Sequence, residues 1–172
     1  THTASPAITG DITGSVFGDD STLLVDGVNN KVVGDIDTAS LRTSETTIAL
    51  GNSAGETTQA TKAIAVGNLA GQTDQGHSAV AIGGDAGSNT QGAGAVAVGV
   101  DAGNATQGEG AVAVGSAAGK TSQGASAVAI GGGAGETSQA ANSIVINATG
   151  VAVENTTASS LRIKPIRNAT MT

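Results

Sequence analysis

Residues 63–67 read Ala-Ile-Ala-Val-Gly, and copies of this pentapeptide recur along the chain. Two looser copies, Thr-Ile-Ala-Leu-Gly at 47–51 and Ser-Ile-Val-Ile-Asn at 143–147, lie before and after the close ones. All seven begin 16 positions apart, at residues 47, 63, 79, 95, 111, 127 and 143. A fixed period that covers more than half of a chain indicates a repeat architecture.

The pentapeptide alternates small with branched residues, which is the period of a β-strand with two different faces. Ala favours helix, but the apolar spacing here is two rather than 3.6, and each unit is rich in Gly and β-branched residues. The sequence therefore predicts an all-β fold: a parallel β-solenoid or β-roll of seven 16-residue repeats, with one coil per repeat. Stacked coils would form two branched ladders and two Ala ladders.

Three sets of residues recur in every close copy and are the candidate structural positions. We predict that the branched residues form the repeat core: Ile64, Val66, Val80, Ile82, Val96, Val98, Val112, Val114, Val128 and Ile130. The Gly after each strand would make a turn that a Cβ atom forbids: Gly67, Gly83, Gly99, Gly115 and Gly131. The recurrent Gln residues either form a hydrogen-bonded amide ladder or face water: Gln59, Gln75, Gln91, Gln107, Gln123 and Gln139.

The remaining segments differ from the repeats and divide the chain into three parts. We predict an N-terminal β-rich cap or connector at 1–46, the β-roll at 47–158 and a C-terminal cap or connector at 159–172. Two β-rich runs around Asp26-Gly27 predict a hairpin. Residues 161–167 alternate apolar with cationic side chains, a pattern of edge strands that resist further stacking. Because the chain begins without Met or a signal-peptide pattern, we expect a piece of a longer protein.

Composition excludes several classes of function. The net charge of −7, from 14 acidic and 7 basic residues, argues against a nucleic-acid partner, because phosphate binding needs clustered cations. No apolar run approaches the roughly 20 residues that span a bilayer. With no Cys and only one aromatic residue, disulfides, thiolate metal sites and a thick core are excluded. Because one coil offers so little to bury, we predict an obligate homotrimer in which the Ala or the branched ladder faces the axis.

No group of residues supports an enzyme, a cofactor or a metal. Of the two His residues, His2 is near the terminus and His77 is in a polar turn without a nucleophile elbow. Asp74, Asp85 and Asp101 recur in turns with Glu residues nearby, but a Ca²⁺ site needs six to eight converging oxygens. We therefore predict no catalytic residue, no cofactor and no metal.

The repeated Ala-Val-Ala-Ile-Gly followed by Ala-Gly resembles the heads of trimeric autotransporter adhesins, which are trimeric parallel β-rolls with units near 14 residues. A closer resemblance is to tail-fibre and structural fibre proteins of tailed bacteriophages. It rests on residues 10–20, 24–28 and 161–167 together with the repeats.

The resemblance implies a non-enzymatic trimeric fibre segment of a phage virion, outside the cell, that spaces or presents a receptor-binding region. Its partners would be copies of itself, other fibre or virion proteins and host-surface glycans or proteins. One alternative is an adhesin head on a bacterial surface. Another is an ice-binding or ligand-binding solenoid, which needs a regular Thr ladder; here Thr58, Thr90 and Thr106 are interrupted by Asp74 and Ser122.

Overall fold

The computed structural model describes residues 16–17, 23–26, 31–32 and 47–166. The chain divides into two compact units, Thr1–Leu41 and Arg42–Thr172, each of which is described by itself. No helix that could span a membrane is found in the described ranges.

The first unit contains a small antiparallel sheet. Strands β1 (Val16–Phe17), β2 (Leu23–Asp26) and β3 (Lys31–Val32) pair in the order β1-β2-β3. Asp26 pairs with Lys31, so the hairpin predicted around Asp26-Gly27 is confirmed. The rest of the predicted N-terminal cap at 1–46 lies outside the described residues.

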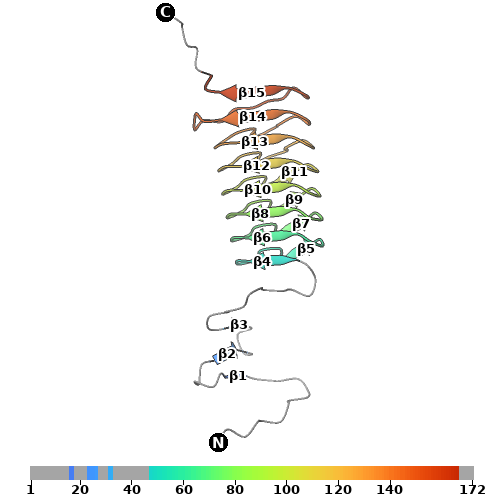
Figure 1. The fold of residues 1–172 in the computed structure, drawn as a ribbon, viewed down its shortest axis with the longest axis vertical. Helices are drawn as coiled ribbons and strands as arrows, with labels where there is room; N and C mark the ends of the chain where they lie inside the picture. Colours follow the sequence, from blue (N-terminus) through green and yellow to red (C-terminus); the bar gives the residue numbers. More distant parts are fainter. Residues whose placement is uncertain (1–15, 18–22, 27–30, 33–46, 167–172) are drawn as a thin grey trace, which may run out of the picture. The chain divides into compact units, whose positions relative to one another are not determined.

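The second unit is a parallel β-roll with an eight-stranded sheet along one side (Figure 1). Its strands stack in the order β15-β14-β13-β12-β10-β8-β6-β4, and each pairs residue for residue with the strand one repeat away, as Ala81 pairs with Ala97. The predicted parallel solenoid with 16-residue spacing is therefore confirmed. The strands are β4 (Ile48–Leu50), β6 (Ile64–Val66), β8 (Val80–Ile82), β10 (Val96–Val98), β12 (Val112–Val114), β13 (Val128–Ile130), β14 (Ile144–Asn147) and β15 (Leu161–Lys164).

A narrower parallel sheet forms a second side of the roll. Strands β5 (Thr57–Gln59), β7 (Thr73–Gln75), β9 (Thr90–Gln91) and β11 (Thr106–Gln107) stack in the order β11-β9-β7-β5. Single parallel bridges extend this column through Gln123 to Gln139. Each coil thus contains one apolar segment and one polar segment, and the same residue types lie above one another in both.

Backbone hydrogen bonds also join the coils at their corners. Gly71 N–H donates to the Ala86 carbonyl at 2.8 Å, and Gly76 N–H donates to the Gln91 carbonyl at 2.8 Å. Because corners as well as strands are bonded to the next coil, the turn backbone satisfies much of its own hydrogen-bonding requirement inside the stack.

The predicted turn glycines are confirmed by their backbone conformation. Gly67, Gly83, Gly99, Gly115 and Gly131 all have φ between 102° and 135°, a region that residues with a Cβ rarely adopt. Space is also lacking, since a Cβ atom built on Gly83 would lie 2.6 Å from the carbonyl oxygen of Gly99 in the next coil.

The prediction that branched residues form the core is wrong for the single chain. The interior consists of three Ala columns, whose members are 0% exposed in the central coils, whereas Ile64, Val66 and the equivalent branched residues point outward and are half-buried or exposed. The physical reason is thickness: a 16-residue coil brings its sides so close that only short side chains fit between them. The inner Ala columns are Ala63, Ala79, Ala95, Ala111 and Ala127; Ala65, Ala81, Ala97, Ala113 and Ala129; and Ala70, Ala86, Ala102, Ala118 and Ala134.

The last strand, β15, closes the C-terminal end of the roll. Arg162 pairs in register with Val145, and Lys164 pairs with Asn147; both partners are buried. Arg162 therefore lies at the register position that points inward in the other strands, and Lys164 lies above the buried Asn147; both cations are exposed at this open end of the roll. A further coil could stack on β15 only by burying these charges, and inward-pointing charge is a known means of protecting sheet edges. The predicted edge strand is confirmed.

Because each coil pairs like with like, deletion of one whole unit should preserve the roll. Removing residues 95–110 places Ala111 after Gly94 and brings Lys120 opposite Asp85, the counterpart of Asp101. We expect a cooperative thermal transition and a rod shorter by about 4.8 Å, measured by circular dichroism and small-angle scattering.

The control for the unit deletion is removal of 95–114, which also takes out β12 and breaks the spacing. This variant should unfold at lower temperature. Equal stability of the two deletions would contradict the requirement for a 16-residue register.

Replacing the inward cations should open the C-terminal edge. The double variant Arg162→Val, Lys164→Thr removes the charge that opposes further stacking, so we expect concentration-dependent association in sedimentation velocity. The exposed substitution Lys120→Thr serves as the control and should leave the sedimentation profile unchanged. A double variant that sediments like the parent chain would rule out this role.

Candidate functional site

The six recurrent Gln residues form one continuous amide ladder through the roll. In every step the Nε2 group of one Gln donates to the Oε1 atom of the Gln one coil later, at 3.1 Å. This confirms the ladder and rejects the alternative in which these side chains face water. The ladder comprises Gln59, Gln75, Gln91, Gln107, Gln123 and Gln139.

Each amide also ties the polar segment of its coil to the apolar strand across the interior. Gln91 Nε2 donates to the Val80 carbonyl at 2.8 Å, and Gln107 Nε2 donates to the Val96 carbonyl at 2.9 Å. One NH₂ group thus uses one hydrogen for the next coil and the other for its own coil. A hydroxyl group could not do both, because it has a single proton.

The ladder is sealed from water from Gln75 to Gln139. Gln75, Gln91 and Gln107 are each 1% exposed. Gly87 lies against the Gln91 amide, so closely that a Cβ atom on it would be 2.8 Å from Gln91 Cδ. Every buried side-chain nitrogen and oxygen in the described part of the chain has a hydrogen-bond partner, as a low-dielectric interior requires.

The ladder ends in the last coil, where a shorter amide takes its place. Asn155 is 6% exposed, and its Nδ2 group donates to the carbonyls of Ile144 and Ser160. The carboxylate of Glu154 accepts from the backbone N–H groups of Thr137 and Ser138 at 2.9 and 3.2 Å. At this end of the roll, side chains thus accept hydrogen bonds from backbone N–H groups that elsewhere bond to carbonyls of the next coil.

The outer face of the eight-stranded sheet is an unbroken apolar surface, which we call the branched stripe. It consists of the two outward residues of each strand, and every one of them is Ile, Val or Leu. Ile82 is 41% exposed, Leu50 51% and Leu161 61%. The outward residues are Ile48, Leu50, Ile64, Val66, Val80, Ile82, Val96, Val98, Val112, Val114, Val128, Ile130, Ile144, Ile146, Leu161 and Ile163.

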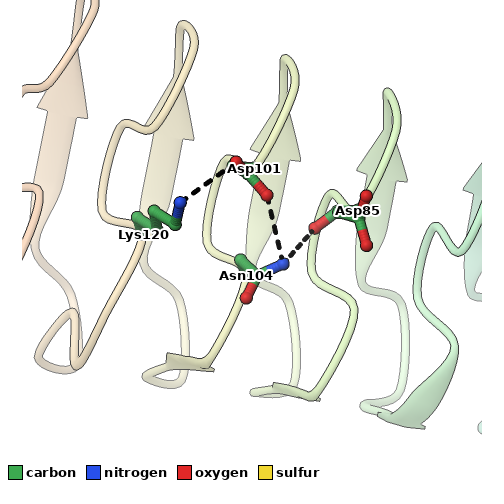
Figure 2. A network of polar contacts seen from close by, with 4 residues as sticks. All are labelled: Asp85, Asp101, Asn104 and Lys120. Atoms are coloured by element: carbon green, nitrogen blue, oxygen red, sulfur yellow. Dashed lines mark hydrogen bonds and ion pairs between the residues drawn. The ribbon is translucent and has the colours of Figure 1, made fainter.

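A polar network crosses three coils at a corner of the roll (Figure 2). Lys120 Nζ lies 3.1 Å from Asp101 Oδ2, while Asn104 Nδ2 donates to Asp101 Oδ1 at 3.4 Å and to the Asp85 carbonyl at 3.1 Å. About a third of each side chain in the ion pair is exposed, so solvent screening leaves it little effect on stability. Both oxygens of the Asp101 carboxylate therefore have a partner within this network.

The carboxylates considered for a metal do not come together. No group of three or more His, Cys, Asp or Glu residues that could hold an ion occurs in the described ranges. Glu56 instead accepts from Gln72 Nε2 at 3.0 Å. That bond, and after it one with Ser53, lowers the pKa of Glu56.

His77 is solvent-exposed, as expected, and its Nδ1 atom lies 2.9 Å from the Ser78 hydroxyl. Residues 47–166 enclose no pocket in which an imidazole could meet a substrate. His2 lies outside the described residues.

Sequence reasoning predicted Ala ladders but not that they, rather than the branched residues, form the interior, and it missed the capping roles of Glu154 and Asn155. One signal for the columns was present: Ala does not vary at these three positions in the five central repeats, while the outward positions exchange Val and Ile. A position that never changes size is under steric restraint. Asn155 also had a signal, because it lies 16 residues after Gln139 and continues the ladder series; Glu154 had none, because no other repeat has Glu at that position.

Comparison with known proteins adds no relative. No family model matches the chain, and neither a curated protein nor a solved structure matches it.

Converting one ladder amide to a carboxylate should destabilise the roll in a pH-dependent way. In Gln107→Glu the shape is kept, but at pH 8 a buried anion replaces an NH₂ donor. We expect a loss of roughly 3–5 kcal/mol in unfolding free energy. Burial raises the pKa of the introduced carboxyl group; the folded state then binds more protons, so stability falls as pH rises above about 4.3.

Denaturant unfolding at pH 4 and pH 8 measures this effect. Thr106→Glu places the same charge on the neighbouring exposed residue and is the matched control, with little expected change. If Gln107→Glu shows the same stability at both pH values, the ladder amide is not sealed as described.

Proposed function

We propose that this chain is a structural, non-enzymatic segment of an extended fibre, a stiff spacer that holds or presents a receptor-binding region. The observation that carries the proposal is the uninterrupted register from β4 to β15, with an interior filled by Ala and an amide ladder. A stack of identical coils can hold two parts of a fibre at a fixed distance, because its length is the number of coils times the strand spacing.

We place this fibre in the virion of a tailed bacteriophage, outside the cell. The support is the resemblance of residues 10–20, 24–28 and 161–167 to phage fibre proteins. In that setting the partners are other fibre proteins and host-surface glycans or proteins, and the assembled unit is a homotrimer. A bacterial adhesin head is the competing setting; it makes the same use of a stiff roll.

The thin interior supports the trimer. Each central coil buries three Ala side chains and one Gln amide, while its branched residues, which would contribute most on burial, stay partly in water. Packing identical chains side by side would remove these residues from water without changing the coil.

The full chain in solution tests the spacer and the trimer separately. Small-angle scattering should show a rod whose roll spans about 34 Å, because eight strands are spaced about 4.8 Å apart. Sedimentation equilibrium should give three times the chain mass of 16.2 kDa, and the assembly should resist detergent and heat on a gel. A folded species of single-chain mass would contradict the trimer, and a compact globule would contradict the spacer.

A further inference from the structure

The branched stripe is a surface for which the single chain provides no cover. Its outward side chains run from Ile48 on β4 to Ile163 on β15 without one charged or polar residue. Water-exposed sheet faces ordinarily alternate apolar-in with polar-out. In this roll both faces of the sheet are apolar: the inward positions carry Ala, and the outward positions carry the larger apolar residues.

The size of the stripe is that of an interface. Eight strands about 4.8 Å apart, with three residues of about 3.3 Å each, give a footprint roughly 34 Å long and 10 Å wide. Its accessible area is greater, because branched side chains stand out from the sheet. The largest apolar patch on an ordinary monomer covers about 300–600 Å², and a stable contact takes about 800 Å² per partner. Eight of the sixteen outward side chains are 36–61% exposed, so the stripe offers more apolar surface than its flat footprint.

The chemistry of the stripe selects its occupant. A ligand with polar or charged groups would leave them unpaired against sixteen aliphatic side chains, two on each of eight strands. A partner must instead be apolar, flat and equally long. The only surface described here with those properties is the stripe itself, which repeats at the same strand spacing over its whole length.

We infer that the branched stripe is the surface through which this chain packs against further copies of itself, parallel and in register. This inference rests on the proposed fibre function and names the partner and the face. The Ala face, which the sequence left as an alternative, is enclosed within each coil and is 0% exposed in the central repeats, so it cannot meet another chain. An axis parallel to the roll places each coil beside the same coil of its neighbours.

In this arrangement the turns beside the stripe also meet. The turn that precedes each strand lies along one margin, and the turn that follows lies along the other. Around a cyclic axis one margin faces the opposite margin of the next chain. At the level of β8 this brings His77 toward Asp85, and at β12 it brings Glu109 toward Ala117, so no two acidic residues are set opposite each other at either level.

Because the chain has no Cys, single Cys variants of the full chain test the inference directly. Val98→Cys lies in the middle of the stripe, and oxidation or a short thiol cross-linker should convert most chains into covalent pairs. Thr106→Cys lies on the polar side of the same coil and is the matched control; it should remain single-chain on a denaturing gel.

A mixture of Val66→Cys and Ile130→Cys chains, refolded together, tests direction. Parallel, in-register packing gives only like-with-like products, since these residues lie four coils apart, whereas antiparallel packing joins the two variants. Distinguishable masses, supplied by a tag on one of them, identify the products. Mixed products, or linkage of Thr106→Cys as efficient as that of Val98→Cys, would overturn the inference.

The double variant Val98→Glu, Val114→Glu provides the second readout. It should sediment at single-chain mass, while Thr90→Glu, Thr106→Glu, with the same charge on the polar side, keeps the mass of the parent. Scattering on the same samples separates the two proposals. A rod of the expected length without Val98→Cys cross-linking contradicts the stripe alone; cross-linking in a species that is no rod contradicts the spacer.

Discussion

One spatial restriction controls the rest of the structure: the roll is so thin that the interior of its central coils holds only the methyl group of Ala and the flat carboxamide of Gln. The amide ladder meets this restriction with chemistry suited to it. Each Gln uses one hydrogen to join its coil to the next and the other to bridge its own coil, as Gln91 does to Gln107 and to the Val80 carbonyl. Stability therefore depends on hydrogen bonds kept from water more than on a large apolar core. Any shift of register would break both sets of bonds together.

The same restriction explains the outer surface. β-Branched residues favour the strand conformation, yet the inward positions of the central coils hold only Ala. The larger side chains are consequently placed on the outward positions of β6 to β13, where they stay partly exposed. In most sheets, alternating residues along a strand place apolar side chains in the core and polar side chains in solvent. Here the alternation places Ala in the interior and larger apolar side chains outside. Folding of the coil and association of the chains thus use opposite faces of one sheet.

The architecture could be predicted almost entirely from the sequence, because seven units at six equal intervals leave one way to stack strands in register. The turn at Gly83 was also predictable, since Gly alone suits that backbone conformation. The identity of the core was not. Alternation shows that Val80 and Ala81 point to opposite sides but does not show which side is inside; hydrophobicity favoured the branched side, and the thickness of the coil reversed that choice. The position of Asn155 follows the repeat, since it lies 16 residues after Gln139; the extra residue in the last step, seventeen from Ile144 to Leu161, comes after Asn155 and was not predictable from the repeat.

The way in which the ladder ends bears on how the roll would respond to mechanical tension. Gln123 is bonded to Gln139, whereas Gln139 keeps its bonds to the carbonyls of Val128 and Ser143 but has no Gln after it, since Asn155 stands at the next position. A pull along the axis would act on all coil junctions in series. The junction without an amide-to-amide link would open first, while the others remain closed. Under tension the C-terminal coil would thus detach first and lengthen the chain at that end, while the remaining coils stay folded.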